Sequence, residues 1–283
     1  DAALSEVMGG ISFLETVRSL LDNWDEAHPK LLADLEELRH ILVACQPSVL
    51  FCTGSASEID KTFACQEELL KALPGAKASP APQTIALATP CQAEVFTTQS
   101  QVNYVAKGCN LYQLGHEYHG MQSVILRHMS RSYLWETVRV LGGAYGGGCS
   151  LDYLTGNFMC ASYRDPNVES TLSAYDGIAS HLEHIALSEG DLNRAVVGTI
   201  GDLDSYLLPP ARGRLTLSRW LNNESEEHLQ QIRDEVLSTK AQDFRDFAEV
   251  MHETAQKGRI CVIGGSEAER KAKENNWQSR SLI

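Results

Sequence analysis

Apolar residues at the start of the chain recur at the spacing of amphipathic helices. This spacing predicts a helix over residues 3–22, where two adjacent glycines weaken the middle, and a second helix over residues 30–44. A short apolar run at 48–52 predicts a strand, and helical spacing returns at about 57–72. The first part of the chain is therefore expected to run helix, helix, strand, helix.

The segment from 73 to 93 is rich in Pro, Ala, Ser and Thr. This composition is typical of a linker or an extended crossover. We therefore expect a domain boundary here, with one part spanning residues 1–93 and a second spanning residues 94–283.

The second part mixes strand-like and helical segments, with a polar tail at its end. Alternation and apolar runs predict one or two strands at 95–106, two strands at 149–154 and 157–163, and a terminal strand at 259–263. Helical spacing predicts helices at about 116–129, 131–141, 168–188, from 191 onwards, 213–222, 226–237 and 241–256, with Pro209-Pro210 as a break. Antiparallel strands with segregated helices indicate an α+β fold, in which a mostly antiparallel sheet is packed by helices.

Composition narrows the classes of function. The net charge of −13 argues against a nucleic-acid partner and permits a cationic one. No run approaches the roughly 18 apolar residues that a membrane span needs, so no membrane partner is expected. The eight cysteines form no C-x-x-C pair, which favours buried thiols in a reducing compartment.

One tyrosine stands among five glycines in the middle of the second part. Tyr145 follows Gly142-Gly143-Ala144 and precedes three further glycines, with Arg139 six residues before it. Glycine permits positive φ and close approach of another chain, so this stretch could present Tyr145 to a peptide or ligand. A helix end that leads into a strand explains the same glycines equally well. A phosphate-binding loop is excluded because no Lys-Ser/Thr pair follows.

The histidines provide no complete metal site. His116 and His119 are three residues apart, as are His181 and His184, and neither pair fits H-E-x-x-H or its inverted form H-x-x-E-H. Zinc needs three or four ligands, and no third ligand is identifiable. We therefore expect solvated or half-buried histidines and no metal ligands in this chain.

Five motifs of the chain are recognisable together. They are Gln101-Val-Asn-Tyr-Val105, Arg139-Val-Leu-Gly-Gly-Ala-Tyr145-Gly-Gly, Ser162-Tyr-Arg-Asp-Pro-Asn167, Val197-Gly-Thr-Ile-Gly-Asp-Leu-Asp-Ser-Tyr206 and Glu235-Val-Leu-Ser-Thr-Lys240. These motifs resemble the C-terminal part of the presequence proteases, the pitrilysin-like zinc metallopeptidases of mitochondria and plastids. The resemblance is strong from about residue 98 to 264, and it is closest to the plant and algal or apicomplexan type. Residues 1–90 fit the end of the preceding, similar domain less specifically.

The resemblance implies a role for named residues. In this family two homologous halves close around a peptide chamber, and the N-terminal half binds the zinc. This chain resembles the C-terminal half, which implies that zinc belongs to the complete enzyme and that none binds here. Arg139 and Tyr145 match a catalytic pair of that half. The resemblance further implies substrate contacts from Gly143, Ala144, Asn103 and Arg164.

The expected function follows from this resemblance. We expect the non-zinc-binding half of an endopeptidase that degrades short unstructured, basic peptides such as organellar presequences. Its partner would be the N-terminal half, the chain alone would be inactive, and its location would be the mitochondrial matrix or a plastid, with the targeting segment absent from this chain. A non-catalytic scaffold or peptide-binding subunit is the alternative, and a metal site on His116 and His119 is a weaker one.

Overall fold

The computed structural model describes residues 2–44, 49, 51–72 and 91–282. The chain divides into two compact units. Unit 1 comprises Asp1–Thr89 and Leu207–Asn223, and unit 2 comprises Pro90–Tyr206 and Glu224–Ile283.

The regular elements of unit 1, in its described residues, are helices. Its elements are α1 (Ala2–Gly9), α2 (Ile11–Asp22), α3 (Trp24–Ala44), α4 (Ala56–Ala72) and α9 (Pro209–Leu221). The helix predicted over 3–22 is two helices, because the paired glycines break it and Gly10 serves as the N-cap of α2. The prolines predicted to break the pattern instead begin α9, since proline is well accommodated in the first helical turn.

Two predictions for the first part fall partly outside the described residues. Residues 48 and 50 of the predicted strand are not described, and residues 49, 51 and 52 are not in a strand. Residues 73–90 of the predicted linker also lie outside the described residues. The division at residue 93 therefore stays a prediction.

Unit 2 is built on one six-stranded sheet. Its strands are β1 (Ala93–Thr97), β2 (Asn103–Asn110), β3 (Gly146–Asp152), β4 (Asn157–Asp165), β5 (Arg259–Gly264) and β6 (Gln278–Ser281), in the order β3-β4-β2-β5-β1-β6. The pairs β3–β4, β4–β2 and β2–β5 are antiparallel. Strand β1 runs parallel to both β5 and β6. The predicted α+β fold with a mostly antiparallel sheet is confirmed.

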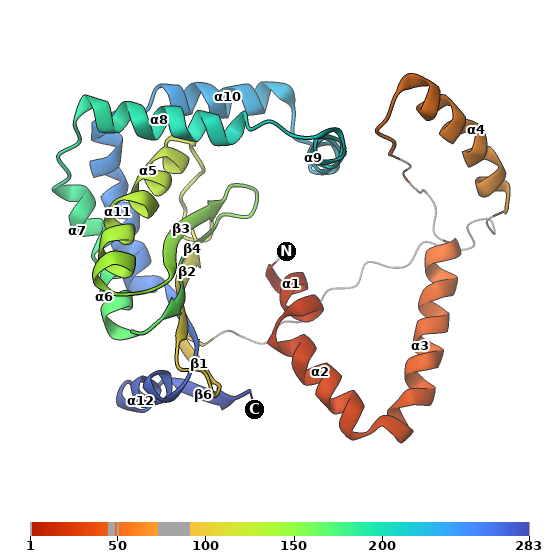
Figure 1. The fold of residues 1–283 in the computed structure, drawn as a ribbon, viewed down its shortest axis with the longest axis horizontal. Coiled ribbons are helices and arrows are strands. Elements are labelled where there is room, and N and C mark those ends of the chain that lie inside the picture. Colours follow the sequence, from red (N-terminus) through yellow and green to blue (C-terminus); the bar gives the residue numbers. More distant parts are fainter. Residues whose placement is uncertain (1, 45–48, 50, 73–90, 283) are drawn as a thin grey trace. The chain divides into compact units, whose positions relative to one another are not determined.

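Helices lie on one side of this sheet (Figure 1). They are α5 (Gly120–Arg131), the π-helix η1 (Trp135–Leu141), α6 (Glu169–Asp176), α7 (Ile178–Glu183), α11 (Ala241–Lys257) and α12 (Ser266–Glu274), while α8 (Glu189–Leu203) and α10 (Glu226–Leu237) pack on α5. The core forms between sheet residues such as Val105 and Phe158 and helix residues such as Met129, Phe244 and Phe247, all buried. Burial of such side chains is the main favourable contribution to folding.

The structure corrects three expectations for unit 2. The helix predicted at 168–188 is divided at Gly177, where the Tyr133 hydroxyl occupies the space that a Cβ would need. The glycines at 146–148 lie inside β3 and do not precede it. The polar tail contains α12 and β6, which the sequence pattern did not predict.

The opposite face of the sheet carries exposed side chains. Along β4, Phe158 and Cys160 are buried toward the helices, whereas Met159 and Tyr163 are exposed on the other side. Tyr104 of β2 is exposed in the same way. Alternation along a strand sends successive side chains to opposite faces, so these residues line a face that no described helix of unit 2 covers.

Candidate functional site at the open sheet face

Arg139 is positioned by a π-helix. The helix predicted at 131–141 is α-helical only in part, since residues 135–141 form a π-helix, a rare element that is frequent at functional sites. On η1 the guanidinium of Arg139 lies over the indole ring of Trp135, with its central carbon 3.9 Å from the ring centroid. This cation–π contact fixes the guanidinium while leaving its N–H groups available.

A tight turn joins η1 to β3. Gly143 has φ +80°, a conformation that favours glycine. The carbonyl of Gly142 accepts a hydrogen bond of 2.6 Å from the Asn167 side chain. The backbone N–H of Ala144 donates to the Val138 carbonyl at 3.1 Å. These two hydrogen bonds hold the turn, and Tyr145 follows it directly before β3.

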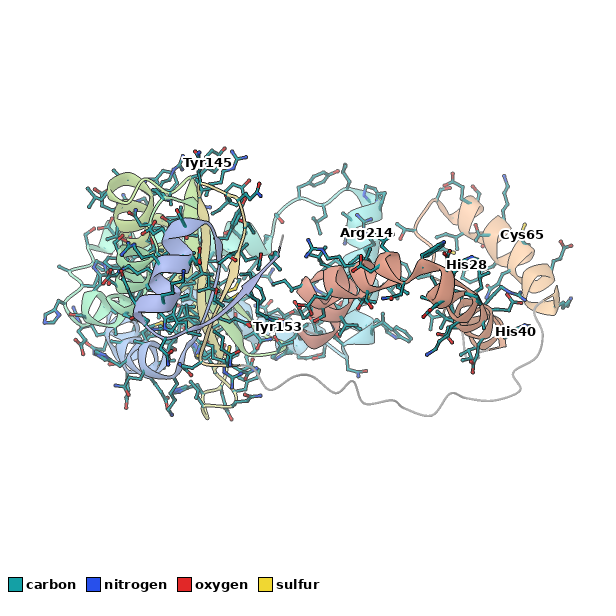
Figure 2. The ribbon with its side chains drawn as sticks, turned by 90° about the horizontal axis from the view of Figure 1, so that it is seen from below. His28, His40, Cys65, Tyr145, Tyr153 and Arg214 are labelled. Atoms are coloured by element: carbon teal, nitrogen blue, oxygen red, sulfur yellow. The ribbon has the colours of Figure 1, made fainter. Side chains whose placement is uncertain are left out.

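Tyr145 lies at the edge of the open sheet face, the face that carries Tyr104 and Tyr163 and that no described helix of unit 2 covers. Its side chain is 67% exposed, and Figure 2 shows it at the outer edge of its unit. Its ring contacts the ring of Tyr163 edge-on, which in turn contacts Tyr104 with centroids 5.4 Å apart. Among the described residues, the Tyr145 hydroxyl has no hydrogen-bond partner. The site thus presents a phenol whose ring contacts Tyr163 and whose hydroxyl is available to donate a hydrogen bond to a ligand.

Arg164 adds a second cation beside the tyrosines. It adopts a positive φ of 49°, which is uncommon for a residue with a side chain. Its guanidinium carbon lies 5.6 Å from the centroid of Tyr163. Neither Arg164 nor Arg139 forms an ion pair with any acidic side chain in the described part of the chain. Guanidiniums without an acidic partner favour an external ligand with oxygen acceptors.

Asp165 and Asn167 support this surface from within. Asp165 is fully buried. Its carboxylate accepts hydrogen bonds from the backbone N–H of Asn167 at 2.9 Å and from the Thr171 hydroxyl at 2.7 Å. The Asn103 side chain donates to the Asp165 carbonyl at 3.0 Å. The motif at 162–167 therefore combines outward residues, Tyr163 and Arg164, with inward ones that fix the turn.

The predicted site residues do not all reach the surface. Gly143, Tyr145 and Arg164 are exposed and Arg139 is half-buried. Asn103 is only 2% exposed and the Ala144 side chain is buried. The Asn103 amide also contacts Glu267 at 3.4 Å, so it is engaged inside the sheet. We therefore leave Asn103 and the Ala144 side chain out of the substrate contacts proposed below.

Sequence reasoning did not assign roles to Tyr104, Tyr163, Trp135 and Asn167. Three of them lie in the motifs quoted above, and Trp135 stands four residues before Arg139. Four residues is the spacing that brings helix side chains onto one face, which was the available signal for the Trp135–Arg139 contact. The Tyr104–Tyr163 contact depends on strand pairing, and nothing local in the sequence specifies it.

The histidines lie apart from this site. The helix predicted at 116–129 begins only at Gly120, so His116 and His119 do not share a helical face. His116 contacts Glu253 at 2.7 Å, and His119 caps α5 by accepting from the Met121 amide. Among the described residues, no three His, Cys, Asp or Glu side chains are arranged to hold a metal ion.

Other features of the surface do not extend the site. A cleft of about 690 Å³ between α5 and α8 is lined by Arg127, Arg131, Val197 and neighbouring residues, and it includes none of the predicted site residues. The described helices contain no segment of the length and apolar character that would cross a membrane.

Comparison with solved structures identifies the class of fold. The chain is similar to the crystal structure of a peptidase M16 inactive domain from Pseudomonas fluorescens, with a TM-score of 0.52 and 16% identity over 73% of this chain and 51% of that one. A protease from Helicobacter pylori also gives a TM-score of 0.52, at 15% identity over 72% of this chain and 52% of that chain. The fold is that of the pitrilysin-like peptidases.

Comparison of sequences identifies the family. Residues 93–267 match the family model of the PreP C-terminal domain. Presequence protease 1, chloroplastic/mitochondrial, of Arabidopsis thaliana is 38% identical over 267 residues, which cover 93% of this chain and 24% of that protein. The mitochondrial presequence protease of Saccharomyces cerevisiae is 24% identical, over 100% of this chain and 29% of that protein. The chain belongs to the presequence protease family, and it spans about a quarter of the length of these relatives.

Proposed function

We propose that this chain is part of the C-terminal, non-zinc-binding half of an endopeptidase that degrades short unstructured peptides, and that it contributes Tyr145 and Arg139 to the reaction. Membership of the presequence protease family supports the peptidase part of this proposal. The observation that carries the residue roles is the exposed, uncommitted hydroxyl of Tyr145 on a ring held by Tyr163, with Arg139 six residues before it.

Tyr145 acts as a hydrogen-bond donor to the scissile carbonyl. Negative charge develops on that oxygen when the carbonyl is attacked, and a donor already in place stabilises this charge more than it stabilises the neutral carbonyl. The contact with Tyr163 limits the motion of the ring, so little reorganisation is needed at the moment of reaction.

Arg139 binds the substrate main chain. Its planar guanidinium presents several N–H donors in a fixed geometry, and the stacking on Trp135 holds that plane. Arg139 therefore orients a peptide carbonyl or carboxylate beside Tyr145. Arg164 and the exposed backbone of Gly143 provide additional contacts to the same substrate.

Zinc is assigned to the N-terminal half of the complete enzyme. The described residues of this chain do not fit a zinc site, because they bring together no group of three or more ligands. In this proposal, the chain holds the peptide and stabilises charge on its carbonyl oxygen.

The substrates proposed are short basic peptides such as organellar presequences, in the mitochondrial matrix or a plastid. The names of the Arabidopsis and yeast relatives support an organellar location. The net charge of −13 favours cationic peptides in general. Because Arg139 and Arg164 are themselves cations, the basic side chains of such a peptide would point away from them and toward other walls of the chamber.

The test is reconstitution. We expect this chain alone to bind no stoichiometric zinc and to leave a fluorogenic basic peptide intact. We expect cleavage when the rest of the enzyme, including the zinc-bearing N-terminal half, is added, and a large loss of turnover when this chain carries Tyr145→Phe. Reconstituted cleavage that is unaffected by both Tyr145→Phe and Arg139→Ala would favour the alternative, a scaffold subunit.

A further inference from the structure

Cys149 and Cys160 face each other directly across β3 and β4. The register of the two strands pairs them. The Cys149 amide donates to the Ser130 hydroxyl at 2.9 Å, and the Cys149 carbonyl accepts from the same hydroxyl at 3.1 Å. Both backbone groups of Cys149 thus point away from β4. The pair therefore occupies a non-hydrogen-bonded position of the antiparallel ladder, where opposing side chains approach most closely.

The two thiols differ in environment. A hydrogen bond with the Cys160 thiol lowers the pKa of Cys149, and the Ser130 hydroxyl, 3.4 Å from the Cys149 sulfur, acts in the same direction. The same contact, together with burial, raises the pKa of Cys160. Cys149 is half-buried at the edge strand, whereas Cys160 is only 2% exposed. Cys149 is therefore the less buried of the two residues and the thiol that ionises first.

We infer that Cys149 and Cys160 form a dithiol redox site, which a hydroperoxide converts into a disulfide across β3 and β4. In the first step the Cys149 thiolate attacks one peroxide oxygen, the O–O bond breaks, and Cys149 becomes a sulfenic acid while the other oxygen leaves as water or an alcohol. In the second step the Cys160 sulfur attacks the Cys149 sulfur. The S–O bond breaks, the S–S bond forms, and the hydroxide leaves as water with the Cys160 proton. Both thiols are oxidised and one hydroperoxide is reduced.

The site lies close to the proposed peptide-binding surface. Cys149 is four residues after Tyr145, and Cys160 is three residues before Tyr163. The disulfide would join β3, which begins directly after Tyr145, to β4, which carries Tyr163. Oxidation would therefore fix the two strands whose aromatic contact positions the Tyr145 ring.

Cys109 is a matched control thiol. It lies on β2 of the same sheet and is partly buried, and burial raises its pKa. Its register partner on β4 is Phe158, and its thiol contacts the Thr254 hydroxyl at 3.6 Å. Cys109 should therefore stay reduced under conditions that oxidise the pair.

The experiment treats the folded 283-residue chain with hydrogen peroxide, then unfolds it in N-ethylmaleimide and maps the cysteines by mass spectrometry. No Lys or Arg separates the two cysteines, so trypsin leaves them in one peptide, whereas a protease that cuts before aspartate separates them at Asp152. We expect a reducible Cys149–Cys160 linked pair of peptides and a maleimide-labelled Cys109. In the Cys160→Ala variant, which has no resolving thiol, we expect a sulfenic acid at Cys149 that dimedone traps.

Three results would overturn the inference. The first is maleimide on both Cys149 and Cys160 after the exposed Cys65 is fully oxidised. The second is further oxidation of Cys149 beside a free Cys160 in the unsubstituted chain. The third is a disulfide that links either residue to a different cysteine.

Discussion

The ring of Tyr145 meets the ring of Tyr163 edge-on, with centroids 5.7 Å apart and planes inclined by 70°. Edge-to-face contact is a preferred arrangement of aromatic pairs. The backbone reinforces it, because the Tyr145 amide donates to the Tyr163 carbonyl at 3.1 Å. A tyrosine with most of its surface in solvent is thereby held in one orientation, which is the property that a charge-stabilising donor needs.

The turn before Tyr145 depends on Asn167. We expect Asn167→Ala to lower the free energy of unfolding by about 0.5–1.5 kcal/mol, because it removes the hydrogen bond to the Gly142 carbonyl. Denaturant unfolding measures this change. Asn193→Ala, at an exposed position of α8, is the control and should have little effect. An equal loss in both variants would contradict the role given to Asn167.

Glycine at position 120 allows α5 to approach α10. A Cβ at this position would lie 2.5 Å from the Ile232 carbonyl oxygen and 2.9 Å from the Glu235 Cβ. We expect Gly120→Ala to destabilise the fold by about 1–3 kcal/mol through overpacking.

Gly201 provides the opposite case for comparison. It lies in α8, and nothing is found within 4 Å of the position that a Cβ would take. We expect Gly201→Ala to stabilise the fold by about 0.4–1 kcal/mol, since alanine reduces the entropy of the unfolded chain. Urea midpoints of the two variants should therefore move in opposite directions. Movement in the same direction would show that the α5–α10 contact does not restrict position 120.

Arg139 is expected to act in substrate binding through its planar, stacked guanidinium. Arg139→Lys keeps the positive charge and loses the planar guanidinium. We therefore expect KM of the reconstituted peptidase to rise about tenfold, equivalent to about 1.4 kcal/mol of binding free energy. Steady-state kinetics on a basic peptide measure this. Arg131→Lys, an exposed change on α5, is the control. A KM that is equally insensitive to both changes would remove Arg139 from the proposed site.

The sequence predicted elements best where one face is continuously apolar. The helices at 226–237 and 241–256 match α10 and α11 within one residue, because Ile232, Val236, Phe244 and Phe247 repeat at helical spacing and are buried. Helix α12 was missed because it is strongly polar, with Ala268, Ala272 and the stem of Lys271 as its buried residues. Small and amphipathic side chains give too weak an apolar period to detect.

The sequence named candidate site residues but not their geometry. The π-helix cannot be distinguished from an α-helix by apolar spacing, so the form of the turn before Tyr145 was not foreseen. Asn103 lies on the helix-facing side of β2 together with Val105 and Lys107, and strand alternation carries this information once the start of β2 is known. The row of Tyr104, Tyr163 and Tyr145 follows from strand pairing, which links residues distant in sequence.

The most direct test of the proposed function is kcat of the reconstituted peptidase with Tyr145→Phe. This substitution keeps the ring that contacts Tyr163 and removes only the hydroxyl, and Tyr104→Phe on the neighbouring strand is the matched control. We expect a fall in kcat of about 10²–10³-fold for Tyr145→Phe, with unchanged thermal stability and near-normal kcat for Tyr104→Phe. An unchanged kcat for Tyr145→Phe would contradict the proposal that this half of the enzyme stabilises charge on the scissile carbonyl.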